Sequence, residues 1–238
     1  MQGCLDPPVA MVADPESGGD NALWLQCWRD RETAFHQTAP NPLLLRFWPG
    51  LGLAAGSRIF VPLCGKSLDM LWLAGQGYEV VGVELSPIAV RAFFKEQRLQ
   101  PVRSQVGPFT LWRAGRIGIL CGDYFALTGA EFGWIDAVYD RAALTAFPEA
   151  TRRLYVAHLK AILPVAARVF LLTTEVPETD EAPAQMLATD AEIVTLYAAA
   201  FEIELAHVEQ ALEVDPAGQD GQPAPVVRKV YRLTPRTA

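Results

Sequence analysis

The sequence predicts an α/β fold: a mostly parallel, twisted sheet with helices on both faces and a C-terminal antiparallel hairpin. Two observations lead to this prediction. Short apolar runs alternate with helical segments over residues 58–200, an order that builds parallel sheets. Beyond this region, residues 201–208 alternate apolar and polar side chains and residues 225–233 form another strand-like run, which together predict the hairpin.

Each predicted element has its own local signal. The run "RIFVPL" predicts a first strand, and Ser67 is expected to cap a helix that ends near Gln76 between two glycines. The run "EVVGVE" predicts a second strand ending at Glu84, after which Ser86 and Pro87 begin a helix. The remaining expected elements are strands at 109–114, 117–123, 135–140 and 168–174, and helices at 149–163 and 190–200.

Composition narrows the function. The chain has 238 residues, 51% of them hydrophobic, which fits one α/β domain with a substantial core. Its formal charge of −7, without a basic stripe, argues against nucleic acid as a partner. No apolar run approaches the roughly 18 residues of a membrane span, and no Lys or Arg precedes position 29 to form a signal peptide. We therefore expect a cytoplasmic protein, monomeric, that acts on small molecules.

Two segments are expected to be irregular, and no metal site is expected. Residues 1–20 combine Asp-Pro pairs and glycines with few large apolar groups, which predicts a flexible tail before one domain spanning 21–238. Residues 215–225 have a similar composition and predict a long loop. The four cysteines show no C-x-x-C spacing and the three histidines are scattered, which argues against a disulfide framework or a zinc site.

The loop "VPLCGKSLD" after the first strand contains Gly-Lys-Ser, as phosphate-binding loops do. Such a loop has the pattern G-x-x-x-x-G-K-[ST], which needs another glycine five positions before Gly65. The residue at that position is Phe60. Glu84 follows Gly65 by nineteen residues, close to the spacing of about 20 at which an acid binds a cofactor ribose. With a single glycine and no G-x-G-x-x-G, the loop lacks a pyrophosphate cradle, which favours S-adenosylmethionine over a nicotinamide cofactor.

Several motifs together carry a family resemblance. The segments "WLQCW", "PLCGKS", "VVGVE", "CGDYFAL" and "YDRAAL", in this order, resemble the bacterial branch of the thiopurine S-methyltransferase family, over about residues 23–172 and weakly over 191–201. The resemblance implies a Rossmann-like, class I methyltransferase fold that uses S-adenosylmethionine. It implies methyl transfer to a thiol or thione sulfur on an aromatic or heterocyclic ring, and some bacterial members are associated with selenium or tellurium compounds instead.

The resemblance also implies where the site lies. It places Trp28, Leu63, Glu84 and Arg141 at the cofactor, with Gly65 and the backbone near Asp123 completing the pocket. We expect the carboxylate of Asp123 either to accept from the adenine amino group or to cap a helix. The segments 175–190 and 215–225 depart from the family pattern, so the acceptor is less constrained than the cofactor.

Other residues have both a functional and a structural interpretation. Trp24 and Trp28 lie four apart, on one helical face, and Phe35 follows, a stripe that either packs in the core or lines a binding site. The resemblance supports the second interpretation, a lid over 21–50 in which Trp24 and Phe35 line the acceptor site. Arg141 is the predicted catalytic residue, and a structural pair with Asp140 is its alternative. We expect His36 to be structural and name no general base, since an acidic thiol is already largely ionised. Two other classes remain open, a nicotinamide-dependent oxidoreductase and a noncatalytic adenosyl-binding module.

Overall fold

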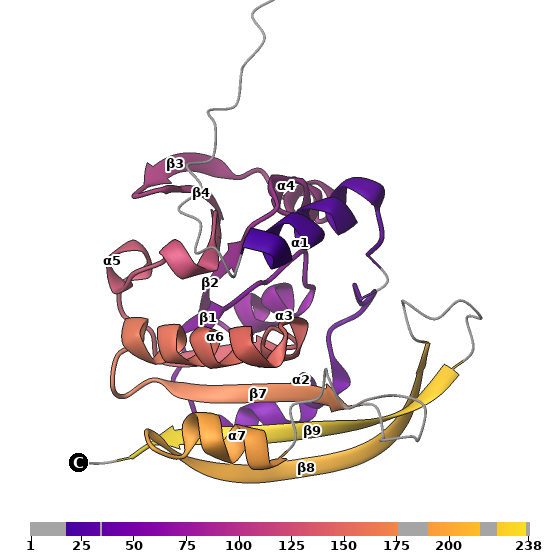
Figure 1. The fold of residues 1–238 in the computed structure, drawn as a ribbon. Coiled ribbons are helices and arrows are strands. Elements are labelled where there is room, and N and C mark those ends of the chain that lie inside the picture. Colours follow the sequence, from indigo (N-terminus) through magenta and orange to yellow (C-terminus); the bar gives the residue numbers. More distant parts are fainter. Residues whose placement is uncertain (1–17, 34, 176–189, 215–222, 237–238) are drawn as a thin grey trace, which may run out of the picture.

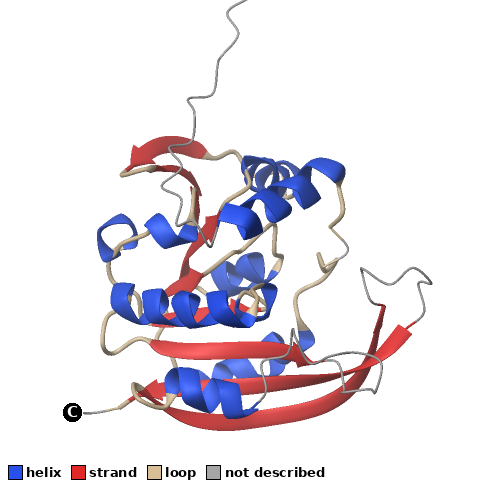
Figure 2. Ribbon diagram, viewed as in Figure 1, coloured by secondary structure: helices blue, strands red, loops and turns tan. Residues whose placement is uncertain are grey.

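The computed structural model describes residues 18–33, 35–175, 190–214 and 223–236. A single nine-stranded sheet lies between two layers of helices (Figures 1 and 2). The divergent segment after position 175, most of the expected tail and most of the expected loop near position 220 lie outside the described residues. Among the described residues, no helix combines the length and apolar character of a membrane span.

The sheet has a parallel centre and two antiparallel ends. Its order is β3-β4-β5-β2-β1-β6-β7-β9-β8, in which β5, β2, β1, β6 and β7 are parallel. The hairpins β3-β4 and β8-β9 close its two ends. The predicted fold class is therefore confirmed. The strands are β1 (Arg58–Val61), β2 (Glu79–Glu84), β3 (Val102–Val106), β4 (Phe109–Ala114), β5 (Ile117–Cys121), β6 (Ala137–Arg141), β7 (Arg168–Glu175), β8 (Phe201–Val214) and β9 (Pro223–Pro235).

Helices cover both faces of the sheet, so the protein has two hydrophobic cores, one on each side. The same strands contribute to both cores, because successive residues of a strand point to opposite sides of the sheet. Phe60 packs in the core shared with α6 and α7, whereas Ile59 and Val61 pack in the core shared with α2, α3 and α4. The helices are α1 (Gly18–Asp30), α2 (Pro42–Phe47), α3 (Asp69–Gly75), α4 (Pro87–Glu96), α5 (Gly129–Phe132), α6 (Glu149–Ile162) and α7 (Asp190–Tyr197), with short 3₁₀ turns η1 (Trp48–Leu51), η2 (Tyr124–Ala126) and η3 (Leu144–Ala146).

The two predicted helix starts have different outcomes. Oγ of Ser86 accepts from the Ala89 N–H at 3.4 Å, which confirms the predicted cap of α4. Ser67 is not the cap of α3, because a turn precedes the helix: the Ser67 N–H donates to the Cys64 carbonyl, and α3 begins only at Asp69. The Ser67 hydroxyl still satisfies one free donor of that helix, since it accepts from the Asp69 N–H at 3.2 Å.

The N-terminal region divides differently from the expected tail and lid. Helix α1 already begins at Gly18, so a tail that ends at position 20 is too long. The second half of the segment expected to form a lid belongs to the core. Trp48 is 1% exposed, and its ring lies 5.4 Å from that of Phe170 and 5.9 Å from that of Tyr139. A lid can therefore extend only from α1 to about Asn41.

Two further boundaries differ from the prediction. Strand β3 was not predicted, because its three central residues are polar and most of it is exposed, and it forms by pairing with β4 from Val102↔Arg113 to Val106↔Phe109. Strand β9 begins at Pro223, inside the expected loop.

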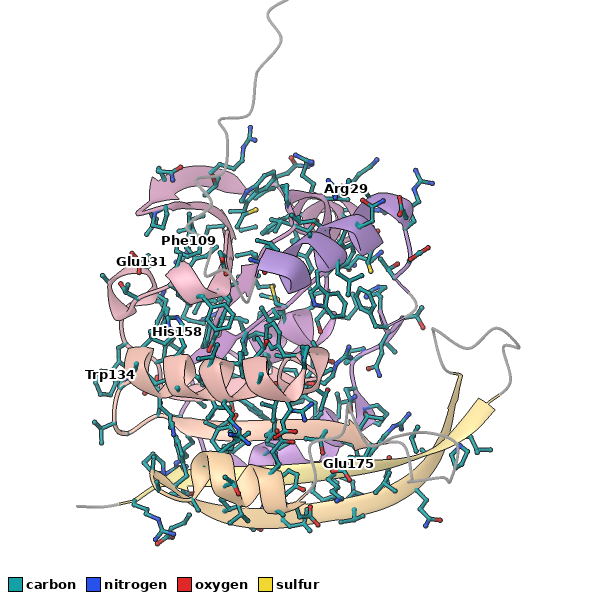
Figure 3. All side chains as sticks on the ribbon, in the orientation of Figure 1. Arg29, Phe109, Glu131, Trp134, His158 and Glu175 are labelled. Carbon is teal, nitrogen blue, oxygen red and sulfur yellow. The ribbon has the colours of Figure 1, made fainter. Side chains whose placement is uncertain are left out.

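The edge of the sheet at the amino ends of the parallel strands carries Trp134, which lies at the left of Figure 3. Its indole N–H donates to Oδ1 of Asp136 at 2.9 Å, and Oδ2 of Asp136 accepts from the Arg58 N–H at 2.8 Å. The carboxylate thus joins the starts of β1 and β6 at the edge opposite the candidate site.

Candidate active site

A cavity opens at the carboxyl ends of β1, β2, β5 and β6, beneath α1, and holds about 1090 Å³ of empty space including its mouth. This is the edge at which parallel α/β sheets bind ligands, where β1 separates β2 from β6. All the residues that the sequence singled out for the site line this one cavity: Trp24, Trp28, Phe35, Leu63, Gly65, Glu84, Asp123 and Arg141.

The loop after β1 forms the floor of the cavity in a strained conformation. Leu63 has φ 46° and Gly65 has φ 53°, both in the left-handed region. For Leu63 this conformation carries a steric cost, of the kind that concentrates at ligand sites. At Gly65 a side chain would also meet a neighbour, because an added Cβ would lie 3.3 Å from Cζ2 of Trp28. The glycine therefore allows the Trp28 ring to pack closely on the backbone of this loop.

Glu84 is buried at the end of β2, and both its carboxylate oxygens are hydrogen-bonded. Oε2 accepts from the Gly65 N–H at 2.8 Å and Oε1 from the Ser86 N–H at 2.7 Å. Burial raises the pKa of Glu84 to about 7, although the N–H donors of Ser86 and Gly65 oppose the shift. A carboxylate has about four acceptor positions, more than these backbone donors use, so capacity remains for a ribose hydroxyl.

Asp123 caps a helical turn, which is one of the two roles predicted for it. Oδ1 accepts from the Phe125 N–H at 3.0 Å and caps η2. Oδ2 accepts at 3.2 Å from Nδ2 of Asn21, a residue that the sequence reasoning missed. Asn21 lies three residues before Trp24 and seven before Trp28, so the helical spacing alone places it on the same face of α1.

Three aromatic rings form a group at the mouth of the cavity. Phe35 lies edge-to-face against both Trp24 and Trp28, with ring centroids 5.6 Å apart in each pair. Trp28 is 6% exposed, whereas Phe35 is 38% exposed. The group thus has a fixed inner ring over the loop after β1 and an accessible outer ring.

Arg141 lies at the carboxyl end of β6 and faces the same cavity. Its Nη1 donates to Oε1 of Gln37 at 2.6 Å and lies 3.6 Å from Oδ2 of Asp69. The alternative pairing with Asp140 is wrong, because consecutive strand residues point to opposite faces. Asp140 instead accepts from the hydroxyl of Tyr155 at 2.7 Å, in the core on the other side of the sheet.

His36 and Lys66 also line the cavity, and neither was assigned to the site from the sequence. Burial lowers the pKa of His36, and the positive charge of Lys66 lowers it further, so the imidazole is neutral at neutral pH. Nζ of Lys66 bonds both carboxylate oxygens of Glu96, at 2.8 and 3.0 Å. Burial raises the pKa of the Cys64 thiol well above its usual value, so this residue packs beside the cavity as a neutral group.

The arrangement fits S-adenosylmethionine. Two carboxylates, Glu84 and Asp123, face the cavity from β2 and β5, and the guanidinium of Arg141 faces it from β6. The hydroxyls and the amino group of the adenosine part match acceptors, and the carboxylate of the methionine part matches a cation.

Comparison with known proteins identifies the family. The family model described as Thiopurine S-methyltransferase (TPMT) matches residues 19–236. The thiopurine S-methyltransferase of Stutzerimonas stutzeri (strain A1501) is 60% identical over 215 residues, which cover 90% of this chain and 91% of the relative. That of Nitrosospira multiformis is 43% identical over 215 residues, covering 90% of this chain and 98% of the relative.

Solved structures show the same fold. The 1,6-didemethyltoxoflavin-N1-methyltransferase of Burkholderia thailandensis, solved with bound 1,6-didemethyltoxoflavin and S-adenosylhomocysteine, aligns with a TM-score of 0.59 at 18% identity over 97% of this chain and 93% of its own. The N-methyltransferase NodS of Bradyrhizobium japonicum, solved with S-adenosylhomocysteine, aligns with a TM-score of 0.56 at 13% identity over 88% of this chain and 97% of its own. Sequence and fold together decide against a nicotinamide-dependent oxidoreductase, and the chain belongs to the thiopurine S-methyltransferase family as an S-adenosylmethionine-dependent methyltransferase.

Proposed function

We propose that the enzyme methylates the sulfur of an aromatic or heterocyclic thiol or thione. One observation carries this proposal: the outer aromatic ring, Phe35, and the guanidinium of Arg141 face the same cavity, with Nη2 of Arg141 3.5 Å from the carbonyl oxygen of Phe35. A flat acceptor ring can pack on the aromatic group while a cation stabilises its sulfur as a thiolate. The family name supports the same acceptor class.

On the cofactor side, each residue has a role that its contacts allow. Glu84 accepts from the ribose with the acceptor capacity that its backbone donors leave, and Asp123 offers Oδ2 to the adenine amino group. Gly65, without a side chain, lets Trp28 pack directly on the loop after β1 and so shapes this wall of the cofactor site. When bound, S-adenosylmethionine supplies a methyl group on a positively charged sulfur.

On the acceptor side, the protein provides position and charge instead of a strong base. An acidic thiol is largely ionised at neutral pH, so its alignment with the methyl group and the exclusion of water account for most of the rate. Arg141 holds the negative charge of the acceptor sulfur, and the aromatic group of Trp24, Trp28 and Phe35 holds its ring. Arg141 is therefore the proposed catalytic residue.

We also propose how the chain is organised. The residues from α1 onward form one catalytic domain, which acts as a monomer in the cytoplasm. Helix α1 and the segment up to Asn41 act as the lid, because they cover the cavity through Asn21, Trp24, Trp28 and Phe35. The tail before α1 has no role in catalysis.

The test is an acceptor panel assayed with S-adenosylmethionine: a thiopurine, a substituted thiophenol, the phenol and aniline of the same ring, an aliphatic thiol, selenite and tellurite. We expect S-methyl products from the two ring thiols, and S-adenosylhomocysteine in equal amount, by mass spectrometry. Methylation of the phenol or aniline without methylation of either ring thiol would overturn the proposal. Faster turnover of selenite or tellurite than of every ring thiol would favour the alternative acceptor class instead.

A further inference from the structure

Asp69 is a buried carboxylate at the first residue of α3, and its side chain is only 1% exposed. Oδ1 accepts from the Asn41 N–H at 2.7 Å, and Oδ2 accepts from the hydroxyl of Tyr139 at 2.8 Å. Oδ2 also lies 3.6 Å from Nη1 of Arg141. Of these partners, only Arg141 carries a positive charge that balances the buried carboxylate.

The same contacts form a closed circuit around the guanidinium. Nη1 of Arg141 donates to Oε1 of Gln37 at 2.6 Å, and that oxygen also accepts from Nδ2 of Asn41 at 3.4 Å. The circuit closes because the backbone N–H of Asn41 donates to Oδ1 of Asp69. Two side chains, Gln37 from the lid segment and Asp69 from α3, thus contact one nitrogen of the guanidinium, and Asn41 links the two.

The circuit fixes one side of Arg141 and leaves the other side available to ligands. Nη1 is engaged by Gln37 and Asp69, whereas Nη2 makes a longer contact of 3.5 Å with the carbonyl oxygen of Phe35. A guanidinium nitrogen carries two N–H groups in the plane of the fork, so the orientation of Nη1 sets the direction in which Nη2 can donate. The strand orientation of β6 adds to this, since Tyr139 and Arg141 lie on the same face and both turn toward Asp69.

We propose that Asp69 is a positioning residue for methyl transfer: it holds the guanidinium of Arg141 in the orientation that catalysis needs and ties the lid segment to that arrangement through Asn41. This inference rests on the catalytic role proposed above for Arg141. Asp69 itself does not line the part of the cavity where ligands bind, and it acts only through Arg141 and the backbone of Asn41. Its effect on the rate is therefore an effect on geometry, and displacement of a reacting group by about 1 Å can cost about 100-fold.

The test is a double-mutant cycle between Asp69→Asn and Arg141→Lys, with activities expressed per folded molecule. Asparagine has the shape of aspartate but neither the charge nor the second acceptor oxygen, so the guanidinium loses its charged partner and keeps only Gln37. We expect Asp69→Asn alone to lower kcat/KM for a ring thiol by about 10- to 100-fold. In the Arg141→Lys background, the same change should cost less than about threefold, because the fork that Asp69 orients is already gone.

Asp136→Asn is the matched control. Asp136 also accepts two hydrogen bonds, from the Arg58 N–H and the Trp134 indole, but at the opposite edge of the sheet. This variant should lower the melting temperature and leave kcat/KM unchanged, in the presence or absence of Arg141→Lys. If Asp69 has only a structural role, Asp69→Asn should change kcat/KM by the same factor with and without Arg141→Lys. Additive losses of this kind would overturn the proposal.

The remaining outcomes are distinguishable. If Arg141→Lys alone keeps the wild-type rate, the proposed role of Arg141 fails and the inference fails with it. If Arg141→Lys is slow and Asp69→Asn is fast, the role of Arg141 stands and only the positioning role of Asp69 is wrong. If Asp69→Asn does not fold, Asp69→Glu keeps a buried charge but displaces the carboxylate. A wild-type rate in that variant would contradict the proposal, and a loss that is not additive with Arg141→Lys would support it.

Discussion

The backbone N–H of Gly65 donates a 2.8 Å hydrogen bond to Oε2 of Glu84, so one buried carboxylate joins the loop after β1 to the end of β2. The other oxygen, Oε1, accepts from the Ser86 N–H at 2.7 Å, directly before α4. Glu84 therefore holds two of the cavity-lining loops together before any ligand binds. Its protonation affects both the shape of the cavity and its capacity to accept from a ribose.

The affinity for S-adenosylhomocysteine should rise with pH between 6 and 8. The pKa of Glu84 is about 7, and ribose hydroxyls donate to the charged form. At pH 6 only about a tenth of the molecules carry the charge and at pH 8 about nine tenths do, so the Kd should fall by up to about tenfold. Calorimetry at pH 6, 7 and 8 measures this, and binding at pH 7 should release protons.

Variants of the same strand provide the control for this pH dependence. Glu84→Gln should bind more weakly, by about 1.5–3 kcal/mol at pH 8, and with little pH dependence. Glu79→Gln, at the other end of β2 beside Arg113 and Arg116, should keep the wild-type profile. If Glu84→Gln retains the wild-type profile, another group controls binding.

The stability of the ligand-free protein should depend on pH in the opposite direction to the affinity. The raised pKa of Glu84 stabilises the fold fully below pH 4.5, and this contribution is lost as pH rises through about 7.

Gly65→Ala should weaken cofactor binding more than its effect on stability explains. The left-handed conformation costs about 1–2 kcal/mol for alanine, and the new Cβ would lie 3.3 Å from Cζ2 of Trp28. Gly115→Ala is the control, since its φ of 57° is similar and no atom lies within 4 Å of an added Cβ. Both variants should lose similar thermal stability, and only Gly65→Ala should also bind S-adenosylhomocysteine at least about tenfold more weakly. Equal affinities would show that the packing of Trp28 on Gly65 does not affect ligand binding.

Asn21→Ala should loosen α1 over the cavity. The mutation removes the 3.2 Å hydrogen bond from Nδ2 to Asp123, and such a bond contributes about 0.5–1.5 kcal/mol. Hydrogen exchange across α1 in the ligand-free protein should therefore accelerate by about 2- to 10-fold. Gln26→Ala removes a hydrogen bond within the same helix, to Asp30, and should leave the cavity side unaffected. Limited proteolysis between α1 and Asn41 that proceeds equally fast with and without S-adenosylhomocysteine would contradict the lid.

Arg141→Lys and Asp140→Asn should have different effects although the residues are adjacent. Lysine keeps the charge and loses the planar fork, so kcat/KM should fall by about 10- to 100-fold while the melting temperature changes little. Asp140 packs on the other face beside Tyr155, and burial raises its pKa to about 6. Asp140→Asn should therefore change mainly thermal stability, with kcat per folded molecule near the wild-type value. Thermal unfolding and kinetics on the same preparations compare the two, and a destabilised, fully active Arg141→Lys would remove Arg141 from the site.

The sequence was sufficient for features that depend on local chemistry. Glu84 could be placed because it ends an apolar run, and parallel strands bring such ends to one edge, whereas Arg141 was assigned to the site by the family resemblance. The cap at Ser86 could be predicted because a cap needs only the next few residues.

Features that depend on distant partners could not be predicted. The acid at position 69 looks like an ordinary acid in the first turn of a helix, and its burial becomes evident only when Tyr139, seventy positions later, donates to it. The exposed strand β3 has no apolar pattern and exists because β4 provides a partner. The aromatic residue Trp48 looked like part of the lid because its core partners, Tyr139 and Phe170, come from strands far along the chain.

The order of strands at the centre of the sheet also bears on how the protein is made. Strand β1 pairs with β2, the next strand along the chain, whereas its other neighbour, β6, is joined to it by contacts such as Arg58 to Asp136, 78 positions apart. A chain that ends after β2 therefore contains the Gly65 loop and Glu84 but not Arg141. Cofactor at a hundred times its Kd stabilises a folded enzyme by about 2.7 kcal/mol. We expect an incomplete chain, which lacks Arg141, to bind cofactor more weakly and to gain less stability from it.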